Sequence, residues 1–178
     1  MWYYTSDLHL DHKNVIKYCG RPFSDVNEMN AALIANWNAR VRDGDTVYIL
    51  GDFCMSGAAN TANFARQLNG RKVLVPGNHD TFAFNPKFDP SVFDEIIDRA
   101  MCTVSDPFIE RKIVLCHFPL AAWRRKENGA LHFYGHVHNS TDELYPYMQE
   151  IENSFNVGVD VQEFFPKTAA EIVASGRK

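Results

Sequence analysis

The residues of this sequence best suited to chemistry are histidines that stand beside Asp, Asn or Gly. The sequence contains seven histidines, at positions 9, 12, 79, 117, 132, 136 and 138. Five of them, His9, His79, His117, His136 and His138, follow short apolar runs of the kind that form strands. A single histidine is more often an ordinary surface or core residue. Because that explanation would have to hold separately for all five, we expect them to share one site.

The acidic and amide side chains near these histidines point to metal binding. Asp7 and His9 lie in one extended stretch, so both can point at one ion across a short turn. The Asp52 carboxylate can bridge two cations, and Asn78 offers a neutral carbonyl oxygen. Nitrogen and oxygen ligands without a thiolate favour Mn, Fe, Zn, Ni or Co over a structural zinc. Because these ligands outnumber the positions of one octahedral ion once water is counted, we expect two divalent ions.

The elements that must position these residues are short strands. β-prone apolar runs that end next to a candidate residue are found at Met1–Thr5, Thr46–Leu50, Lys72–Val75, Lys112–Cys116 and Ala130–Tyr134, and another run covers Phe155–Val159. Polar residues at the carboxyl ends of such strands are where open α/β sheets bind ligands. No long helix is indicated between the last two runs, so we expect the second half to be largely antiparallel.

Helical patterns lie between the strands. Apolar residues at helical spacing predict an amphipathic helix over Asp25–Arg42, with Ser24 or Asp25 as its N-cap. Weaker patterns predict helices at Asp11–Cys19 and Ala58–Leu68. Pro166 stands where a first helical residue belongs, so we expect a C-terminal helix from there to about Ser175. Together these elements predict an α/β sandwich with a mixed sheet.

Length and composition predict a single domain that covers residues 1–178. The 46% hydrophobic content, against 22% charged residues, permits a substantial core. A formal net charge of −4 argues against an extended nucleic-acid surface. The four cysteines form no CxxC pair, which argues against a zinc ribbon. The N-terminus lacks the pattern of a signal peptide and no run of about 18 apolar residues occurs, so we expect a cytoplasmic protein that does not enter a membrane.

The ordered motifs resemble those of the calcineurin-like metallophosphoesterase superfamily. The matching segments are Asp7-Leu8-His9, Gly51-Asp52, Gly77-Asn78-His79-Asp80, His117 and Gly135-His136-Val137-His138. They span residues 7–138, and their ordered combination is far more specific than any one of them. The opening TSDLHLDHKNVIKYCGRPF is also similar to a branch of small bacterial and phage phosphoesterases.

The resemblance implies a fold and a set of metal ligands. The fold is α/β, with two mixed β-sheets packed face to face in a sandwich flanked by helices, giving four αββα layers. Asp7, His9 and His138 would hold one metal ion, Asn78, His117 and His136 would hold the other, and Asp52 would bridge them. His79 would remain uncoordinated and face the substrate.

The reaction implied is metal-dependent hydrolysis of a phosphoric ester. A hydroxide that bridges two ions, most simply of manganese, would attack phosphorus, and His79 would give a proton to the leaving alkoxide. Two divalent ions, ionised Asp7 and Asp52 and the hydroxide leave a net charge of about +1, which matches a singly charged diester better than a monoester. We therefore expect a phosphodiesterase that acts on a small, nucleotide-like phosphate ester.

The sequence departs from the protein-phosphatase branch of this superfamily. In that branch a GDxxDRG motif supplies a second Asp that orients the catalytic His and an Arg that binds phosphate. The corresponding stretch here is GDFCMS, residues 51–56. A phosphoprotein phosphatase is therefore not expected, and Asp80 or a backbone carbonyl is left to orient His79 in catalysis.

Five further residues are candidate substrate contacts. His12 and Asn14 follow the first motif directly, although they could equally lie on a helix surface. Arg21 sits in a Gly-Arg-Pro-Phe loop that could present its guanidinium to phosphate, or it could be a plain surface charge. Phe118 and Trp123 follow His117 and could form an apolar wall for a base or aryl group, although core packing is an alternative.

Two other functions remain open at this stage. The same metal core could serve a phosphomonoesterase or a nucleotide pyrophosphatase, and the sequence does not separate these from a phosphodiesterase. A non-catalytic protein-interaction scaffold with a retained metal site belongs to a different class. Such a scaffold is expected to lose the catalytic histidine or several ligands, and all of these are present here.

Overall fold

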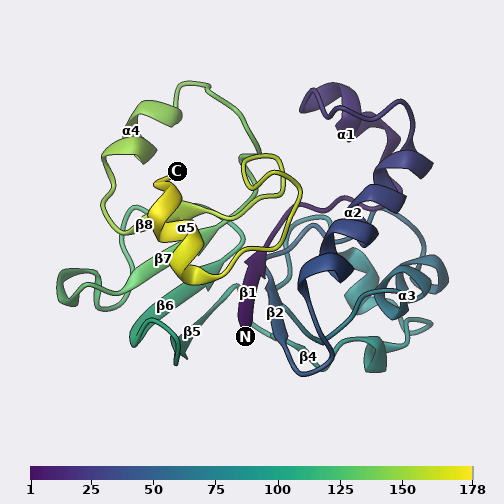
Figure 1. Ribbon diagram of the computed structural model, residues 1–178, viewed down its shortest axis with the longest axis horizontal. Coiled ribbons are helices and arrows are strands. Elements are labelled where there is room, and N and C mark those ends of the chain that lie inside the picture. Colours follow the sequence, from purple (N-terminus) through teal and green to yellow (C-terminus); the bar gives the residue numbers. More distant parts are fainter. Residues whose placement is uncertain (178) are drawn as a thin grey trace.

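Two four-stranded sheets packed face to face form the centre of the computed structural model, which describes residues 1–177 (Figure 1). The first sheet contains, in spatial order, β1 (Trp2–Thr5), β2 (Thr46–Ile49), β3 (Arg71–Leu74) and β4 (Glu95–Ile96). The second contains β5 (Met101–Asp106), β6 (Arg111–Cys116), β7 (Leu131–Tyr134) and β8 (Ser154–Asn156). The expected sandwich is confirmed, but only the second sheet is mixed, because all neighbours in the first are parallel.

The side chains of β1 show how the layers are held together. Successive residues of a strand point to opposite faces, so Tyr3 and Tyr4 enter different cores. Tyr3 packs in the cluster between the first sheet and its helices, whereas Tyr4 packs in the cluster between the two sheets. The Tyr4 hydroxyl donates a hydrogen bond of 2.8 Å to the Asp106 carboxylate at the end of β5. One strand thus joins three layers.

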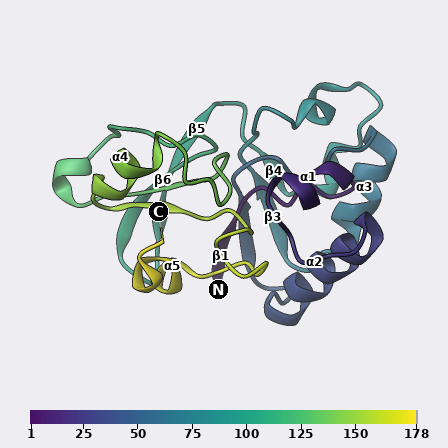
Figure 2. The same cartoon turned by 90° about the horizontal axis from the view of Figure 1, so that it is seen from above.

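Helices α2 (Val26–Arg40) and α3 (Ala58–Arg66) cover the outer face of the first sheet (Figure 2). Their buried residues Leu33, Trp37 and Ala65 lie in the same cluster as Tyr3. The carboxylate of Asp25 caps α2 by accepting hydrogen bonds from the backbone of residues 27 and 28. The sequence prediction of this helix and of Asp25 as a possible N-cap is therefore confirmed.

The other face of the sandwich is covered by less regular structure. A cluster of Val114, Trp123 and Ala130 packs there, next to Ile151 at the end of α4 (Tyr145–Glu150). A 3₁₀ turn at Lys126–Asn128 lies between β6 and β7, in the same connection as Trp123. Helix α5 (Ala169–Ser175) instead adds its buried residues to the core between the sheets.

Two expectations about the second half need correction, and two of its strands were not expected. It is not largely antiparallel, because β6–β7 and β7–β8 are parallel and only β5–β6 is antiparallel. Parallel neighbours need a crossover connection that returns the chain to the end of the sheet at which the previous strand began. Segments 117–130 and 135–153 are these connections, and neither contains a long helix. The last helix begins at Ala169 and not at Pro166, because Thr168 and Glu171 form a capping box. Strands β4 and β5 were not expected, and β5 alternates between exposed and partly buried residues.

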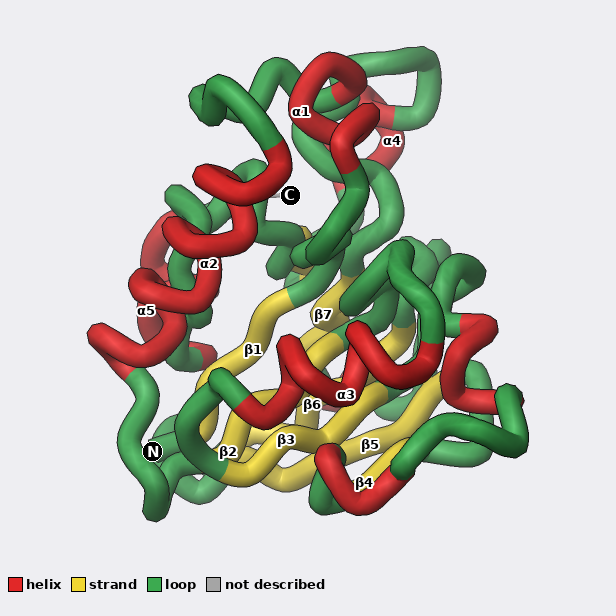
Figure 3. The backbone as a smooth tube through the Cα atoms, turned by 90° about the vertical axis from the view of Figure 1, so that its right-hand side faces the viewer, coloured by secondary structure: helices red, strands yellow, loops and turns green. Residues whose placement is uncertain are grey.

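Several strands end on the same side of the molecule. In Figure 3, β1 runs toward the end at which α1 (Lys13–Tyr18) and α4 lie, and it finishes in loops below them. The parallel β2 and β3 finish beside it, and β6 and β7 finish in the facing sheet. The expected polar loops therefore come together at one edge. No helix within residues 1–177 is long and apolar enough to cross a membrane.

Candidate metal centre

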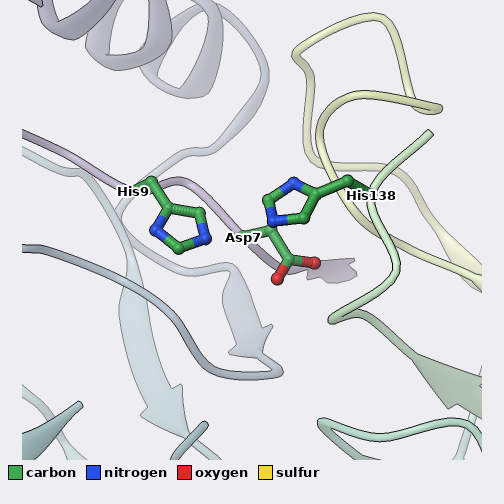
Figure 4. A group of neighbouring side chains, drawn as sticks. All are labelled: Asp7, His9 and His138. Atoms are coloured by element: carbon green, nitrogen blue, oxygen red, sulfur yellow. The ribbon is translucent and has the colours of Figure 1, made fainter. Parts of the chain in front are cut away.

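The first group of possible ligands comes from two strand ends. Asp7 and His9 follow β1 and His138 follows β7, and one ligand atom of each lies within 4.8 Å of the others. In Figure 4 the His138 ring lies just above the Asp7 carboxylate, and the His9 ring lies to the left of both. The two ring centroids are 5.0 Å apart. These three residues could hold one metal ion.

The second group comes from three other loops. One ligand atom each of Asp52, His117 and His136 lie within 4.8 Å of one another. The His117 Nδ1 lies 2.7 Å from the Leu50 carbonyl oxygen, which can only accept, so this nitrogen carries a proton. That assignment leaves the His117 Nε2 to face the Asn78 Oδ1 at 3.0 Å. The lone pairs of both atoms are well placed to bind one cation.

Asp52 belongs to the second group and also faces His9 of the first. Its Oδ2 lies 3.5 Å from the His9 Nε2 and 3.4 Å from the His117 Nε2. The His9 Nε2 is buried and has no hydrogen-bond partner within the described residues 1–177. Metal bonds of about 2.1 Å to a nitrogen and an oxygen at an angle of about 110° separate the two ligand atoms by about 3.4 Å. The residues therefore fit metal ions on both sides of the Asp52 carboxylate.

The backbone at these positions is unusual. Five residues of the two groups have left-handed backbone, with φ of 57° at Asp7, 50° at His9, 54° at Asp52, 70° at His136 and 50° at His138. Hydrogen bonds join the loop after β1 to the loop after β2, since the Asp7 and His9 N–H groups donate to the carbonyls of residues 51 and 52 at 3.0 and 2.9 Å. Left-handed residues outside glycine are uncommon and gather at functional sites.

Two glycines permit the close approach of these loops. Gly51 has a φ of 84°, and a Cβ there would lie 2.6 Å from the His117 Nδ1. A Cβ at Gly135 would collide with the Ser6 hydroxyl and the Asp7 carboxylate. The next residue, His136, uses its N–H to donate to both Asp7 carboxylate oxygens at 3.1 and 3.0 Å. The glycines of the GD and GHVH motifs thus have a steric role.

The two carboxylates of the centre differ in their electrostatics. Burial raises the pKa of Asp7 to about 6, despite the opposing effect of His138 and His117. Burial also acts to raise the pKa of Asp52, but the hydrogen bond and charge of His117 and the His79 N–H outweigh it and lower this pKa to about 2. A divalent cation nearby favours the ionised form of both groups.

Asp160 is a neighbour of the centre that the sequence analysis missed. Its Oδ2 lies 2.7 Å from the His138 Nδ1, which leaves the His138 Nε2 free to face a metal ion. Burial acts to lower the pKa of His138, but hydrogen bonds with Asp160 and Cys19 and the charge of Asp7 raise it to about 10. Asp160 directly follows the predicted strand Phe155–Val159, the same position that singled out the other candidates, so the signal was present.

Arg21 does not occupy the place expected for it. Its side chain is fully buried and forms two hydrogen bonds of 2.7 and 2.9 Å with the Asp160 carboxylate. It also donates to the carbonyls of Asp7 at 2.7 Å and Leu8 at 2.9 Å. The expected contact between Arg21 and phosphate is therefore corrected: the guanidinium faces inward and braces the loop that carries the first motif.

Asp80 is likewise placed differently from the expectation. Its buried carboxylate accepts hydrogen bonds from the N–H groups of Asp52, Phe53 and Gly77 at 2.8 to 2.9 Å. The side chain thus fastens two motif loops together and is not directed at the His79 ring. His79 itself is exposed, its N–H donates to the Asp52 Oδ1 at 3.0 Å, and its ring centroid lies 5.6 Å from that of His9.

The four remaining candidates lie in four different surroundings. Phe118 is 42% exposed and its ring centroid is 4.5 Å from that of His136, so it borders the centre. His12 is half-buried with its Nδ1 3.4 Å from the His9 Nδ1. Asn14 lies exposed on α1. For Trp123 the structure bears out core packing and not a substrate contact, because this side chain is 8% exposed and its Nε1 donates to the Ala130 carbonyl within a core cluster.

Known proteins resemble this chain over most of its length. The family model for calcineurin-like phosphoesterases matches residues 3–106. An uncharacterized protein of Methanocaldococcus jannaschii is 38% identical over 175 residues, which cover 96% of this chain and 88% of that protein. The Gene 66 protein of Mycobacterium phage L5 is 29% identical over 160 residues, 77% of each chain.

A solved structure shares the whole fold. The crystal structure of a protein of unknown function from Aquifex aeolicus superposes with a TM-score of 0.75 at 26% identity and covers 98% of both chains. The phage relative agrees with the expected branch of small phage-type enzymes. Because the family model matches more than half of the residues, this chain belongs to the calcineurin-like phosphoesterase family and is a metal-dependent phosphoesterase.

Proposed function

We propose that this protein hydrolyses the phosphodiester bond of a small, nucleotide-like substrate at a centre of two divalent ions, most simply manganese. The observation that carries the proposal is the position of the Asp52 Oδ2, 3.5 Å from the His9 Nε2 and 3.4 Å from the His117 Nε2. One carboxylate oxygen thus faces a histidine of each ligand group. This is the arrangement that a bridging ligand requires.

The ligand sets follow from the two groups. Asp7, His9 and His138 would hold one ion, and His117, His136 and Asn78 would hold the other, with Asp52 shared. When bound, such ions lower the pKa of a coordinated water toward neutrality and neutralise charge that develops on the phosphoryl oxygens. Asp160 and the Leu50 carbonyl orient two of the imidazoles by accepting from their Nδ1–H groups.

His79 is proposed to donate a proton to the leaving oxygen. Its ring is exposed, close to His9, and belongs to neither ligand group. The Asp52 Oδ1 and the Asp80 carboxylate fix the backbone of its loop through the N–H groups of His79 and Gly77. Asp80 therefore acts as a positioning residue, and its contribution to catalysis comes through the loop.

Charge favours a diester over a monoester. The balance of about +1 calculated for the ions and their anionic ligands matches a substrate with one negative charge. Arg21 cannot add to this balance, because Asp160 already neutralises it in a buried pair. A doubly charged monoester would leave the centre net negative.

The test uses protein stripped of metal by a chelator. Bis(p-nitrophenyl) phosphate should not be hydrolysed until Mn²⁺ is added, and p-nitrophenyl phosphate should remain the poorer substrate by kcat/KM. Mass spectrometry or atomic absorption should find two ions per chain in the wild type and fewer in Asp52→Asn. Asp89→Asn, at an exposed carboxylate paired with Arg66, is the matched control and should keep both ions. Full activity after verified metal removal, or two ions per chain in Asp52→Asn, would overturn the dinuclear centre, and a preference for the monoester would overturn the diester assignment.

A further inference from the structure

A cavity of about 540 Å³ adjoins the proposed metal centre. His136 and His138 form the part next to the metal ligands, and Tyr18, Cys19, Asp142 and Leu144 are among the residues that form the rest. We refer to it as the side cavity. Pockets that bind small molecules have volumes of about 300–1,000 Å³, so the side cavity is large enough for one ring-bearing group.

The walls of the side cavity come from two separate segments. One wall is the end of α1 at Tyr18 and Cys19, and the other is the loop that follows His138. The Asn139 side chain joins them by donating a hydrogen bond of 2.8 Å to the Cys19 carbonyl. In Figure 1, α1 and α4 both lie at the top, the end toward which β1 runs. The cavity is therefore held by a contact between the walls as well as by the metal-ligand loops.

Two apolar side chains in the lining are exposed. Tyr18 is 76% exposed and Leu144 is 52% exposed, although large apolar groups gain free energy from burial. The Tyr18 ring meets the His12 ring edge to face, with centroids 6.3 Å apart, so one aromatic contact orients it next to the first ligand loop. Both side chains offer apolar surface that a ligand can cover.

The charges of the lining restrict what the side cavity can accept. Among residues 1–177, none of those that line it is a lysine or arginine, and Asp142 is the one ionisable carboxylate in this lining. The Asp142 Oδ1 accepts a hydrogen bond from the Leu144 N–H at 3.0 Å, which holds the carboxylate at the cavity. In the part of the cavity away from the metal ligands, a second phosphate group would meet the Asp142 carboxylate and no lysine or arginine side chain of the described lining. A neutral ring meets apolar surface.

We propose that the side cavity binds a neutral aromatic or heterocyclic ring of the substrate, with Tyr18 as its stacking platform. The inference rests on the proposed diesterase function, since the scissile phosphate must lie at the metal centre for the ring to reach the cavity. It assigns the protein to diesters of ring-bearing alcohols and excludes diphosphates and longer polyphosphates as its substrates. Aromatic stacking of this kind corresponds to roughly a tenfold change in affinity.

The test compares two singly charged phosphonate esters that differ only in a ring. Benzyl methylphosphonate carries the ring and ethyl methylphosphonate does not. Their inhibition constants against bis(p-nitrophenyl) phosphate, and their dissociation constants from calorimetry, are measured with the full chain loaded with Mn²⁺. The benzyl ester should bind about tenfold more tightly to the wild type. Tyr18→Ala should remove most of this advantage, and Tyr18→Phe should keep it.

Tyr147→Ala is the matched control, because Tyr147 is 70% exposed and does not line the side cavity. This variant should leave the affinity for both esters unchanged. Equal affinity of the wild type for the two esters, or an unchanged advantage of the benzyl ester in Tyr18→Ala, would overturn the inference while leaving the diesterase function intact. If neither ester competes with the diester, the proposed function fails and the inference fails with it.

Discussion

Replacing Arg21 by methionine tests whether this residue supports the fold or contacts the substrate. The Arg21 side chain is 0% exposed and the Asp160 side chain 1%, with two guanidinium–carboxylate contacts of 2.7 and 2.9 Å. Methionine fills similar volume but removes the guanidinium from the buried Asp160 carboxylate, which then keeps only the His138 ring as a partner. Breaking a buried ion pair in this way costs about 3–5 kcal/mol. The variant also loses the two bonds to the carbonyls of Asp7 and Leu8.

The expected fall in thermal stability follows from this free energy. In a domain of this size 1 kcal/mol corresponds to about 2–4 °C, so Arg21→Met should lower the Tm by roughly 6–20 °C. Scanning calorimetry or circular dichroism of metal-free protein measures it. Arg40→Met is the control, because its partly exposed pair with Glu171 is worth less than about 1 kcal/mol. Its Tm should fall by less than about 4 °C.

Substrate selectivity provides the second measurement. Because the guanidinium faces the interior, the ratio of kcat/KM for bis(p-nitrophenyl) phosphate to that for p-nitrophenyl phosphate should be the same in Arg21→Met and in the wild type. Rates and metal affinity should fall together, because the loop that carries Asp7 and His9 loses its hydrogen bonds with the guanidinium. A Tm within about 2 °C of the wild type, together with a selective loss of monoester hydrolysis, would refute the structural role of Arg21. It would support a contact between Arg21 and the substrate phosphate instead.

Three other changes are expected to have distinct effects. His79→Ala should retain its metal content yet hydrolyse alkyl diesters about 10²–10⁴-fold more slowly, with a smaller loss for p-nitrophenolate, which leaves without a proton; equal losses for both would argue against a general acid. Gly135→Ala should reduce metal binding measured by calorimetry, because the new Cβ collides with Asp7; unchanged affinity would show that the loops can move apart. His132 is buried with its pKa lowered by burial to about 4, so protonation favours the unfolded chain. The neutral form of His132 therefore contributes roughly 3 kcal/mol to the free energy of unfolding. This contribution is complete above about pH 6.5 and is lost as the pH falls toward 4. The stability difference between wild type and His132→Gln in urea should therefore shrink from pH 7.5 to pH 5, and a constant difference would contradict this assignment.

The positions of the candidate ligands could be predicted because short stretches of sequence indicate them. Each apolar run ends where a polar residue follows, and the parallel strands β1, β2 and β3 bring three of these ends together. The direction of β7 and β8 could not be predicted in the same way, because irregular crossovers replaced the helix that usually marks a parallel pair.

The role of Arg21 lies beyond local sequence signals. Its partner Asp160 is 139 residues away in the sequence, so only the tertiary fold brings the two side chains together. Nothing in the surrounding Gly-Arg-Pro-Phe stretch indicates which way the guanidinium points. Trp123 is similar, since the same apolar side chain can line a cleft or fill a core, and packing against Val114 and Ala130 decides between them.

The left-handed backbone at Asp7, His9, Asp52, His136 and His138 restricts which amino acids these positions can accept. Aspartate, asparagine and histidine tolerate this conformation several times better than most residues do, whereas a bulky or β-branched residue does not. The residue at each position must therefore meet two requirements. It must supply a ligand atom for a metal ion, and it must tolerate a left-handed backbone conformation. Glutamate and cysteine satisfy the first requirement and lack the special tolerance that the second demands. A designer who grafts these side chains onto ordinary strands would reproduce the list of ligands but not their convergence.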